Sequence, residues 1–122
     1  MNHNPIPLLQ IQNVSKSFGP TRAVDDVSLD IFQNEFFALL GPSGCGKTTL
    51  ARIVAGFETK SSGSVQIDGN EVSGPSADNI FVFQHNGLLP WLTVWENVCL
   101  GLRNLTDESE RASRAQEYID VV

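Results

Sequence analysis

The stretch from Phe36 to Ala55, FFALLGPSGCGKTTLARIVA, constrains the fold of this chain more than any other. Its first residues, 36–40, are all apolar, a run that is too short to span a bilayer and typical of a strand buried on both faces. Residues 41–48 match the pattern G-x-x-x-x-G-K-[ST] at every fixed position. Apolar residues then recur at helical spacing, and Gly56 is suited to end that helix in a left-handed conformation. The stretch therefore predicts a strand, a phosphate-binding loop and a helix in succession.

The loop predicts the chemistry of the site. Glycines allow successive backbone N–H groups to point inward at phosphate oxygens, and the following helix adds the positive end of its dipole. Lys47 supplies a charge to the terminal phosphates, and the Thr48 hydroxyl is suited to hold Mg²⁺. The alternative is a glycine-rich strand-to-helix turn that merely contains a lysine. The residues that we expect to contact a nucleotide here are Gly41, Ser43, Gly44, Cys45, Gly46, Lys47, Thr48 and Thr49.

Length and composition limit the function classes. The 122 residues suffice for one domain, and 41% hydrophobic with 18% charged residues is typical of a soluble globular protein. A formal net charge of -6 argues against nucleic acid as the primary partner. Residues 1–9 lack the pattern of a signal peptide, and two cysteines, Cys45 and Cys99, agree with a reducing compartment. We therefore expect a cytosolic protein whose membrane contact comes through a partner.

Before the loop, the pattern predicts an antiparallel sheet. Residues 9–14 and 27–31 alternate apolar with polar, residues 22–24 suit a brief strand, and residues 15–20 suit a turn. Phe18 lies in this turn without an apolar pattern around it. Its ring either stacks on a flat base or folds back onto the sheet.

After the loop, residues 64–70 read as a strand and a turn, because Asp68-Gly69 is a strong hairpin signal. Residues 80–83 form a second short apolar run, which we expect beside residues 36–40 in a central sheet. Gln84 ends this run, so it either reaches a metal or water at the phosphates or caps a loop. His85 suits a solvated loop.

The last third of the chain predicts two helices. Residues 88–92, LLPWL, form an apolar cluster that either plugs the core or is exposed to another protein. Thr93 and Glu96 have capping-box spacing for a helix through about Leu102, and a second helix starts near Asp107. Its apolar stripe, which includes Ala115, continues to Val122.

The order of Phe18, the loop at 41–48, Gln84 and LLPWLTVWENV resembles the first half of an ABC-transporter ATP-binding subunit, from Leu8 onward. The segment EFFALLGPSGCGKTTL is similar to bacterial import ATPases in general. The segment GPSADNIFVFQHNGLLPWLTVWENV is more similar to nitrate, sulfonate and taurine importers. The fold class implied is α/β, a P-loop NTPase with an N-terminal antiparallel β subdomain.

The resemblance implies roles for particular residues. Phe18 matches the adenine-stacking aromatic, and Val24 joins the nucleotide-binding residues. Gln84 matches the glutamine that contacts Mg²⁺ and the attacking water, so Thr48 and Gln84 are the expected metal contacts and ATP with Mg²⁺ the expected cofactors. Residues 88–91 resemble the surface near the groove for the transmembrane permease subunit, although core packing of Trp91 is an equal alternative.

The resemblance also shows what the chain lacks. A complete subunit of the family carries a signature helix, an acidic strand end with a catalytic glutamate, and a switch histidine, all after the glutamine. None is in this sequence, and neither His3 nor His85 takes the place of that histidine. Hydrolysis in the family needs a second ATP-binding subunit, so we expect this chain to bind MgATP and to hydrolyse it poorly.

Our main hypothesis is a partial ABC ATP-binding domain over residues 1–122, truncated before these motifs. Residues 1–7 are a loose end, 8–103 the β subdomain and P-loop core, and 104–122 the start of the helical subdomain. The protein would lie on the inner face of the bacterial membrane through the permease. One alternative is a non-enzymatic module that docks on the membrane subunit through residues 88–91. Another is a different P-loop enzyme such as a small kinase, for which we see neither an acceptor site nor a lid.

Overall fold

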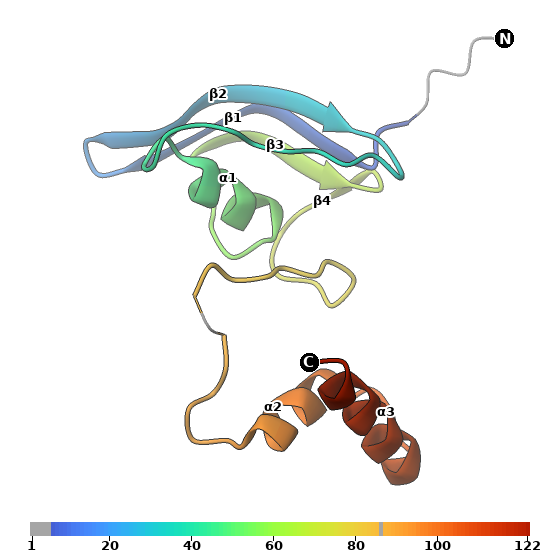
Figure 1. Cartoon of the computed structure of the whole chain (residues 1–122). Helices are drawn as coiled ribbons and strands as arrows, with labels where there is room; N and C mark the ends of the chain where they lie inside the picture. The colour runs from blue at the N-terminus through green and yellow to red at the C-terminus, as the bar shows by residue number, and fades with distance from the viewer. Residues whose placement is uncertain (1–5, 86) are drawn as a thin grey trace, which may run out of the picture. The chain divides into compact units, whose positions relative to one another are not determined.

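A computed structural model describes residues 6–85 and 87–122 of the chain. The chain divides into two compact units, Met1–Phe81 and Val82–Val122. The first unit holds a sheet and one helix, and the second holds two helices (Figure 1).

The first unit is built on a four-stranded antiparallel sheet in the order β2-β1-β3-β4. Its strands are β1 (Leu9–Phe18), β2 (Thr21–Ile31), β3 (Ser62–Ile67) and β4 (Asn70–Glu71). The predicted hairpin at Asp68-Gly69 is confirmed, because both residues have positive φ and join β3 to β4. The predicted antiparallel sheet is therefore confirmed.

Two boundaries in this sheet were predicted wrongly. Residues 15–18, expected in a turn, extend β1, and the two pieces expected at 22–24 and 27–31 form one strand, β2. The register between β1 and β2 is irregular after Ile11, and Asn13 and Asp26 both have positive φ. A bulge breaks the period-2 pattern without ending the strand, so sequence alternation alone reads it as a turn.

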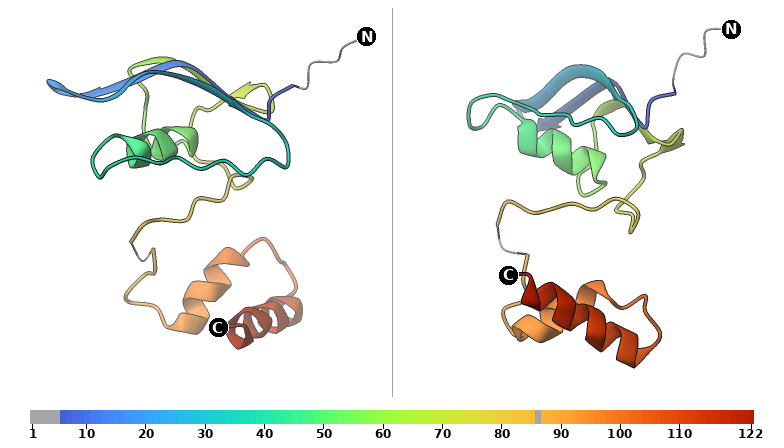
Figure 2. Two further views of the ribbon diagram at one scale, coloured as in Figure 1. Left: turned by 45° about the horizontal axis from the view of Figure 1, so that its top comes forward. Right: turned by 45° about the vertical axis from the view of Figure 1, so that its right-hand side comes forward.

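Helix α1 (Lys47–Val54) covers one face of the sheet (Figures 1 and 2). Leu50 and Ile53 of this helix are buried, as the helical spacing predicts. Gly56 has φ 79 and follows the helix, which confirms the predicted left-handed end. The buried core cluster consists of Ile11, Val14, Val24, Leu50, Ile53 and Val65.

The two predicted central strands are not formed. Residues 36–40 and 80–83 have no regular secondary structure, and Phe36 and Leu40 are 96% and 92% exposed. Ile80 is 93% exposed, whereas the ring of Phe81 packs edge-on against Phe57 at 5.5 Å between centroids. A strand buried on both faces needs neighbours in its sheet and covering layers, and the described residues provide none for these segments.

The second unit contains α2 (Val94–Gly101) and α3 (Glu108–Asp120). The predicted capping box is present, with Thr93 and Glu96 each bonding the other's backbone N–H. Asp107 caps α3 by accepting from the N–H groups of Ser109 and Glu110. Ala115 is fully buried, as its place on the apolar stripe predicts, but Val122 at the end of that stripe is exposed.

Among the described residues no helix combines the length and hydropathy needed to cross a membrane. The domain boundary expected near residue 103 stays a prediction, and residues 1–5 of the loose end lie outside the described residues.

Candidate phosphate-binding site

The N-terminus of α1 differs from those of the other described helices. Gly46 at its N-cap has no side chain, no side-chain hydrogen bond caps the helix, and its first turn has no acidic residue. By contrast, α2 begins with a capping box and α3 with a capping aspartate. The first-turn N–H groups of a helix have no partner within the helix. Those of α1 are therefore available to an anion, with the helix dipole favouring negative charge.

The loop before α1 closes around the Lys47 ammonium. Lys47 Nζ donates to the carbonyl oxygens of Gly41 and Pro42, each at 2.7 Å, and lies 3.4 Å from Cys45 Sγ. A lysine at the first helical position has thus turned back over the loop, where it can meet phosphate oxygens. The predicted succession of strand, loop and helix is confirmed for the loop and the helix, but not for the strand.

Gly46 lets the loop lie directly against β2. A Cβ at this position would lie 2.1 Å from the carbonyl oxygen of Ala23 and 3.7 Å from Cγ2 of Val24, and Gly46 has φ 99. Only glycine satisfies both constraints. A cavity of about 460 Å³ opens here between β2 and the loop, and its lining includes Val24, Cys45 and Lys47. Val24 thus lies beside the loop and is buried in the core, and its contact with a nucleotide stays a prediction.

The donor set at the loop fits Mg²⁺ held through phosphate. Thr48 is an exposed residue at the start of α1. No group of three or more His, Cys, Asp or Glu side chains comes together in the described part of the chain. Mg²⁺ commonly keeps several waters and takes one or two protein ligands together with substrate phosphates. A threonine hydroxyl beside a phosphate loop fits that arrangement. Of the other two predicted hydroxyl residues, Ser43 is exposed and Thr49 is half-buried.

Phe18 lies at the end of β1 and is 48% exposed. Its ring neither folds into the core nor stands free, because Lys16 Nζ lies 4.8 Å from the ring centroid. Lys16 itself is buried and forms an ion pair with Glu58 at 2.6 Å. The stacking of Phe18 on a base stays a prediction.

Gln84 and His85 are exposed residues of the second unit. The phosphate loop belongs to the first unit, so the predicted contact of Gln84 with Mg²⁺ at the loop stays a prediction. His3 lies outside the described residues.

The apolar cluster at 88–92 is displayed rather than buried in its unit. Leu88 and Trp91 are 63% and 75% exposed. The side chain of Asn97 holds this loop on α2: Oδ1 accepts from the Leu89 N–H at 2.8 Å, and Nδ2 donates to the carbonyls of Leu89, Leu92 and Thr93. Within this unit, the core-packing alternative for Trp91 is not supported.

Sequence reasoning missed Lys16, Glu58 and Asn97. Lys16 precedes Phe18 by two positions, and residues so spaced in a strand share a face, which was a usable signal. No sequence pattern around Glu58 indicates its partner Lys16, which lies 42 positions away. No pattern around Asn97 indicates its bond to Leu89, eight positions away.

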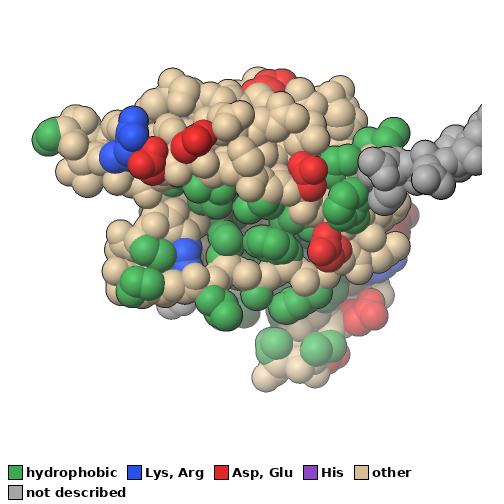
Figure 3. Space-filling view, turned by 90° about the horizontal axis from the view of Figure 1, so that it is seen from above, with side chains coloured by type: hydrophobic (Ala, Val, Ile, Leu, Met, Phe, Trp, Pro, Cys, Tyr) green, Lys and Arg blue, Asp and Glu red, His purple; other side chains and the backbone are tan. Residues whose placement is uncertain are grey.

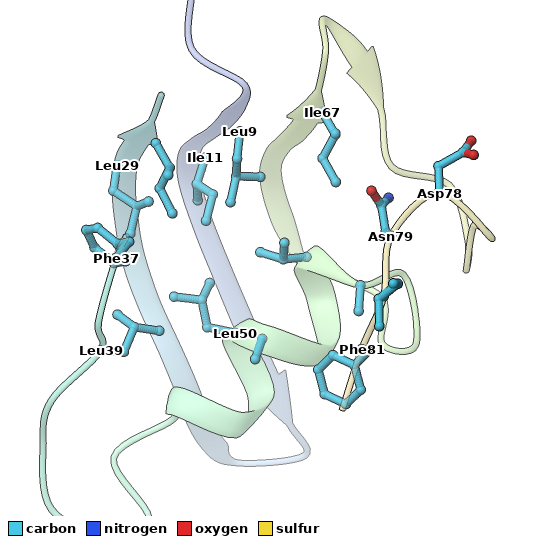
Figure 4. Close-up of a pocket in the computed structure, with 15 residues that line it drawn as sticks. Leu9, Ile11, Leu29, Phe37, Leu39, Leu50, Ile67, Asp78, Asn79 and Phe81 are labelled. Carbon is cyan, nitrogen blue, oxygen red and sulfur yellow. The ribbon is translucent and has the colours of Figure 1, made fainter. Parts of the chain in front are cut away.

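A second cavity of about 460 Å³ lies beneath the sheet, and its lining is mainly apolar. Figure 3 shows hydrophobic side chains gathered in a band, with acidic side chains scattered around it. Side chains from three strands and α1 line the cavity, together with both segments expected as central strands; Figure 4 labels Leu9, Ile11, Leu29, Phe37, Leu39, Leu50, Ile67 and Phe81 among them. This surface is suited to apolar packing rather than to a polar ligand.

Comparisons with known proteins show the family of the chain. The family model described as "ABC transporter" matches residues 24–122. The sulfate/thiosulfate import ATP-binding protein of Pseudomonas syringae is 48% identical over 123 residues, which cover 93% of this chain and 37% of that protein. The taurine import ATP-binding protein of Jannaschia is 46% identical, with 92% and 42% covered. The putrescine transport ATP-binding protein of Escherichia coli is also 46% identical, with 95% and 32% covered.

Solved structures of ABC transporter cassettes are also similar to this chain. A dimeric bacterial ABC transporter cassette, MJ0796, superposes with a TM-score of 0.77 at 34% identity, covering 89% of this chain and 54% of the cassette. A dimeric post-hydrolysis state of that cassette, bound to ADP and Pi, superposes with a TM-score of 0.75 at 33% identity over the same shares. These similarities confirm the predicted fold class, an α/β P-loop NTPase with an antiparallel β subdomain. The chain spans less than half the length of the three curated relatives.

Proposed function

Because the chain belongs to the ABC transporter ATP-binding family, we propose that it is the nucleotide-binding part of a subunit that couples ATP hydrolysis to solute import. The observation that carries this proposal is the closed loop at the open start of α1, where Lys47 Nζ lies 2.7 Å from two loop carbonyls. An ammonium and unpartnered first-turn N–H groups at one point suit the phosphates of a nucleotide.

The proposed binding roles follow the chemistry of each residue. Backbone N–H groups from Ser43 to Thr49 and the Lys47 ammonium hold the phosphates. The Thr48 hydroxyl would be a ligand of Mg²⁺. Gln84 reaches the metal and the attacking water in the assembled subunit. Phe18 stacks on the adenine, and Val24 contacts the nucleotide beside the loop. Mg²⁺ held there by Thr48 and Gln84 would neutralise charge on the phosphates.

We place the subunit with importers of the nitrate, sulfonate and taurine type. The support is the segment GPSADNIFVFQHNGLLPWLTVWENV together with a taurine import protein among the relatives. Sulfate/thiosulfate and putrescine transport proteins are similarly related, so this assignment is finer than the family itself.

The proposed partners are a second ATP-binding subunit and a transmembrane permease subunit. Two solved structures of a cassette similar to this chain, MJ0796, are dimeric. The permease would contact the region around Gln84 and residues 88–91, which places the subunit on the inner face of the membrane. The 122 residues contain no match to the family's signature helix, catalytic glutamate or switch histidine. By themselves they bind MgATP and hydrolyse it weakly.

Calorimetric titration of the 122-residue chain with MgATP tests the nucleotide proposal. The Lys47→Ala variant should lose at least about tenfold in affinity, because a charge-assisted contact to phosphate is removed. The control is Lys60→Ala, since Lys60 pairs with Glu71 away from the loop. Folded wild-type protein without Mg²⁺-dependent ATP binding, or equal affinities for the wild type and Lys47→Ala, would contradict the proposal.

A second candidate function is a non-enzymatic module that docks on the membrane subunit. The exposure of Leu88 and Trp91 favours this function. Asn97 holds the loop that carries them by accepting a hydrogen bond from the Leu89 N–H. Co-purification with the permease should then persist in Lys47→Ala and be lost in Trp91→Ser. The absence of any association with the permease would exclude this function.

A further inference from the structure

We propose that Lys16 and Glu58 are a positioning pair that holds the Phe18 ring with one face covered by the Lys16 ammonium and the other presented to a nucleobase. This inference rests on the proposed nucleotide-binding function and deepens it. It assigns roles to two residues outside the phosphate loop.

The geometry joins three side chains from two segments. Lys16 and Phe18 are two positions apart in β1, and the Lys16 Nζ lies 4.8 Å from the centroid of the ring. The same Nζ is 2.6 Å from Glu58 Oε1, in the loop after α1. The carboxylate therefore fixes the ammonium where it contacts the ring.

Burial shows that the lysine is held rather than loosely placed. The side chain of Lys16 is 11% exposed and that of Glu58 is 26% exposed. Lysine is rarely buried unless it is paired, because its charge loses hydration. A hydrogen bond from Lys16 Nζ to Thr59 Oγ1 at 3.4 Å adds a further partner. The hydrogen bond from the Lys16 ammonium lowers the pKa of the Glu58 carboxyl, so this carboxylate stays ionised at neutral pH.

Attachment of the loop does not rest on this pair alone. The Ser61 N–H donates to the Ser15 carbonyl at 2.8 Å, and the Ser17 N–H donates to Ser61 Oγ at 3.1 Å. These two bonds attach the loop to β1 in addition to the ion pair. Because a buried ion pair contributes little net stability, the distinctive effect of Lys16 is its position against Phe18.

The half-exposed ring suits the proposed role. Phe18 keeps 48% of its surface accessible while Lys16 lies over one face. A cation attracts π-electron density toward itself, so the opposite face becomes less negative and repels the face of a purine less. A ring that is already oriented also loses less side-chain entropy when a base stacks on it.

The test compares two probes, MgATP and magnesium tripolyphosphate, because only the first carries a base. The dissociation constant of magnesium tripolyphosphate divided by that of MgATP measures the contribution of the base. Lys16→Met keeps the length of the side chain and removes its charge, and should reduce this ratio about three- to tenfold while tripolyphosphate affinity stays unchanged. Lys16→Arg, which retains the cation, should keep the wild-type ratio.

Two further variants separate positioning from a structural effect. In a Phe18→Leu background, Lys16→Met should have no further effect on the ratio, because its target ring is gone. Glu58→Gln keeps the shape of the pair and should reduce the ratio by a smaller factor, which gives a result even if Lys16→Met does not fold.

The experiment distinguishes a failure of the proposed nucleotide-binding function from a failure of the Lys16–Glu58 inference. Wild-type protein that binds neither probe contradicts the proposed function. Wild-type protein that binds ATP more tightly than tripolyphosphate, with an unchanged ratio in Lys16→Met and Glu58→Gln, overturns this inference alone. An equal loss of affinity for both probes, or an undiminished effect of Lys16→Met in the Phe18→Leu background, also overturns it.

Discussion

Gly46 is the residue on which the geometry of the loop depends most. Its φ of 99 and the carbonyl of Ala23, 2.1 Å from where a Cβ would lie, both require glycine. Gly46→Ala should therefore destabilise the protein by more than about 2 kcal/mol, because it adds a backbone clash to conformational strain. Urea unfolding measures this difference.

The matched control for that variant is Gly19→Ala. Gly19 also has positive φ, but nothing lies within 4 Å of its Cβ position. Gly19→Ala should lower the free energy of unfolding by only about 1 kcal/mol, because it adds only the strain of the left-handed conformation. Equal costs at the two positions would show that the loop does not pack against β2.

Cys45 reports occupancy of the loop. Its thiol is exposed and lies 3.4 Å from Lys47 Nζ, whereas Cys99 is half-buried in α2. MgATP should slow alkylation of Cys45, because phosphates and the repositioned lysine cover the sulfur. Mass spectrometry of both cysteines in the same sample provides the control, since the rate at Cys99 should not change. Equal protection of both would indicate a general change in folding instead.

At the scale of elements, the capping box of α2 links stability to pH. The backbone N–H and then the hydroxyl of Thr93, at 2.7 and 2.9 Å, hold the pKa of Glu96 below its usual 4.5. The unfolded chain therefore binds this proton more readily than the folded one. Its stabilising contribution is fully present above pH 4.5 and is lost as the pH falls through the lowered folded value.

Thermal unfolding followed by the fluorescence of Trp91 and Trp95 checks this prediction, since both tryptophans lie in the second unit. The melting temperature of wild-type protein should fall between pH 5 and pH 3, and Glu96→Gln should show a smaller fall. Glu117→Gln on an exposed position of α3 is the control and should behave like the wild type. An identical pH dependence in all three proteins would contradict the role of Glu96.

Local signals in the sequence predicted the elements that depend on local contacts. The hairpin at Asp68-Gly69, the Thr93 cap and the helix after Lys47 are each specified by residues within a few positions. The segments 36–40 and 80–83 have equally clear apolar patterns, but a central strand is stabilised by neighbouring strands and covering layers. Their composition therefore identified two apolar segments without determining whether a strand forms.

The same reasoning explains which parts of the site were predictable. The phosphate loop is contiguous, so its motif could be recognised in the sequence, and the binding roles of Lys47, Thr48 and the glycines stay predictions. The ion pair of Lys16 with Glu58 was not predictable, because Glu58 lies in the loop after α1 and is brought to Lys16 by the packing of α1 on the sheet.

For the whole molecule, exposed apolar segments are the main liability. Leu40 and Ile80 are each more than 90% exposed, and both belong to segments of strand-forming composition. Such surfaces favour association between chains. Sedimentation should show concentration-dependent oligomers of the wild type and fewer of Ile80→Asp, with a stability change within about 0.5 kcal/mol because the site is exposed.

The control is Val121→Asp, an exposed position at the end of α3. It should leave association unchanged, because it lies outside both segments. A monodisperse wild type at all concentrations would contradict the account of these surfaces.

The central claim is that residues 43–49 hold the phosphates of MgATP, and backbone amide NMR of the labelled chain tests it most directly. Addition of MgATP should shift the amide resonances of Gly44, Gly46, Lys47 and Thr48 more than those of β4 or α3, and Lys47→Ala should abolish these shifts at the same nucleotide concentration. Saturable binding with unshifted loop amides, or shifts confined to other elements, would contradict the claim.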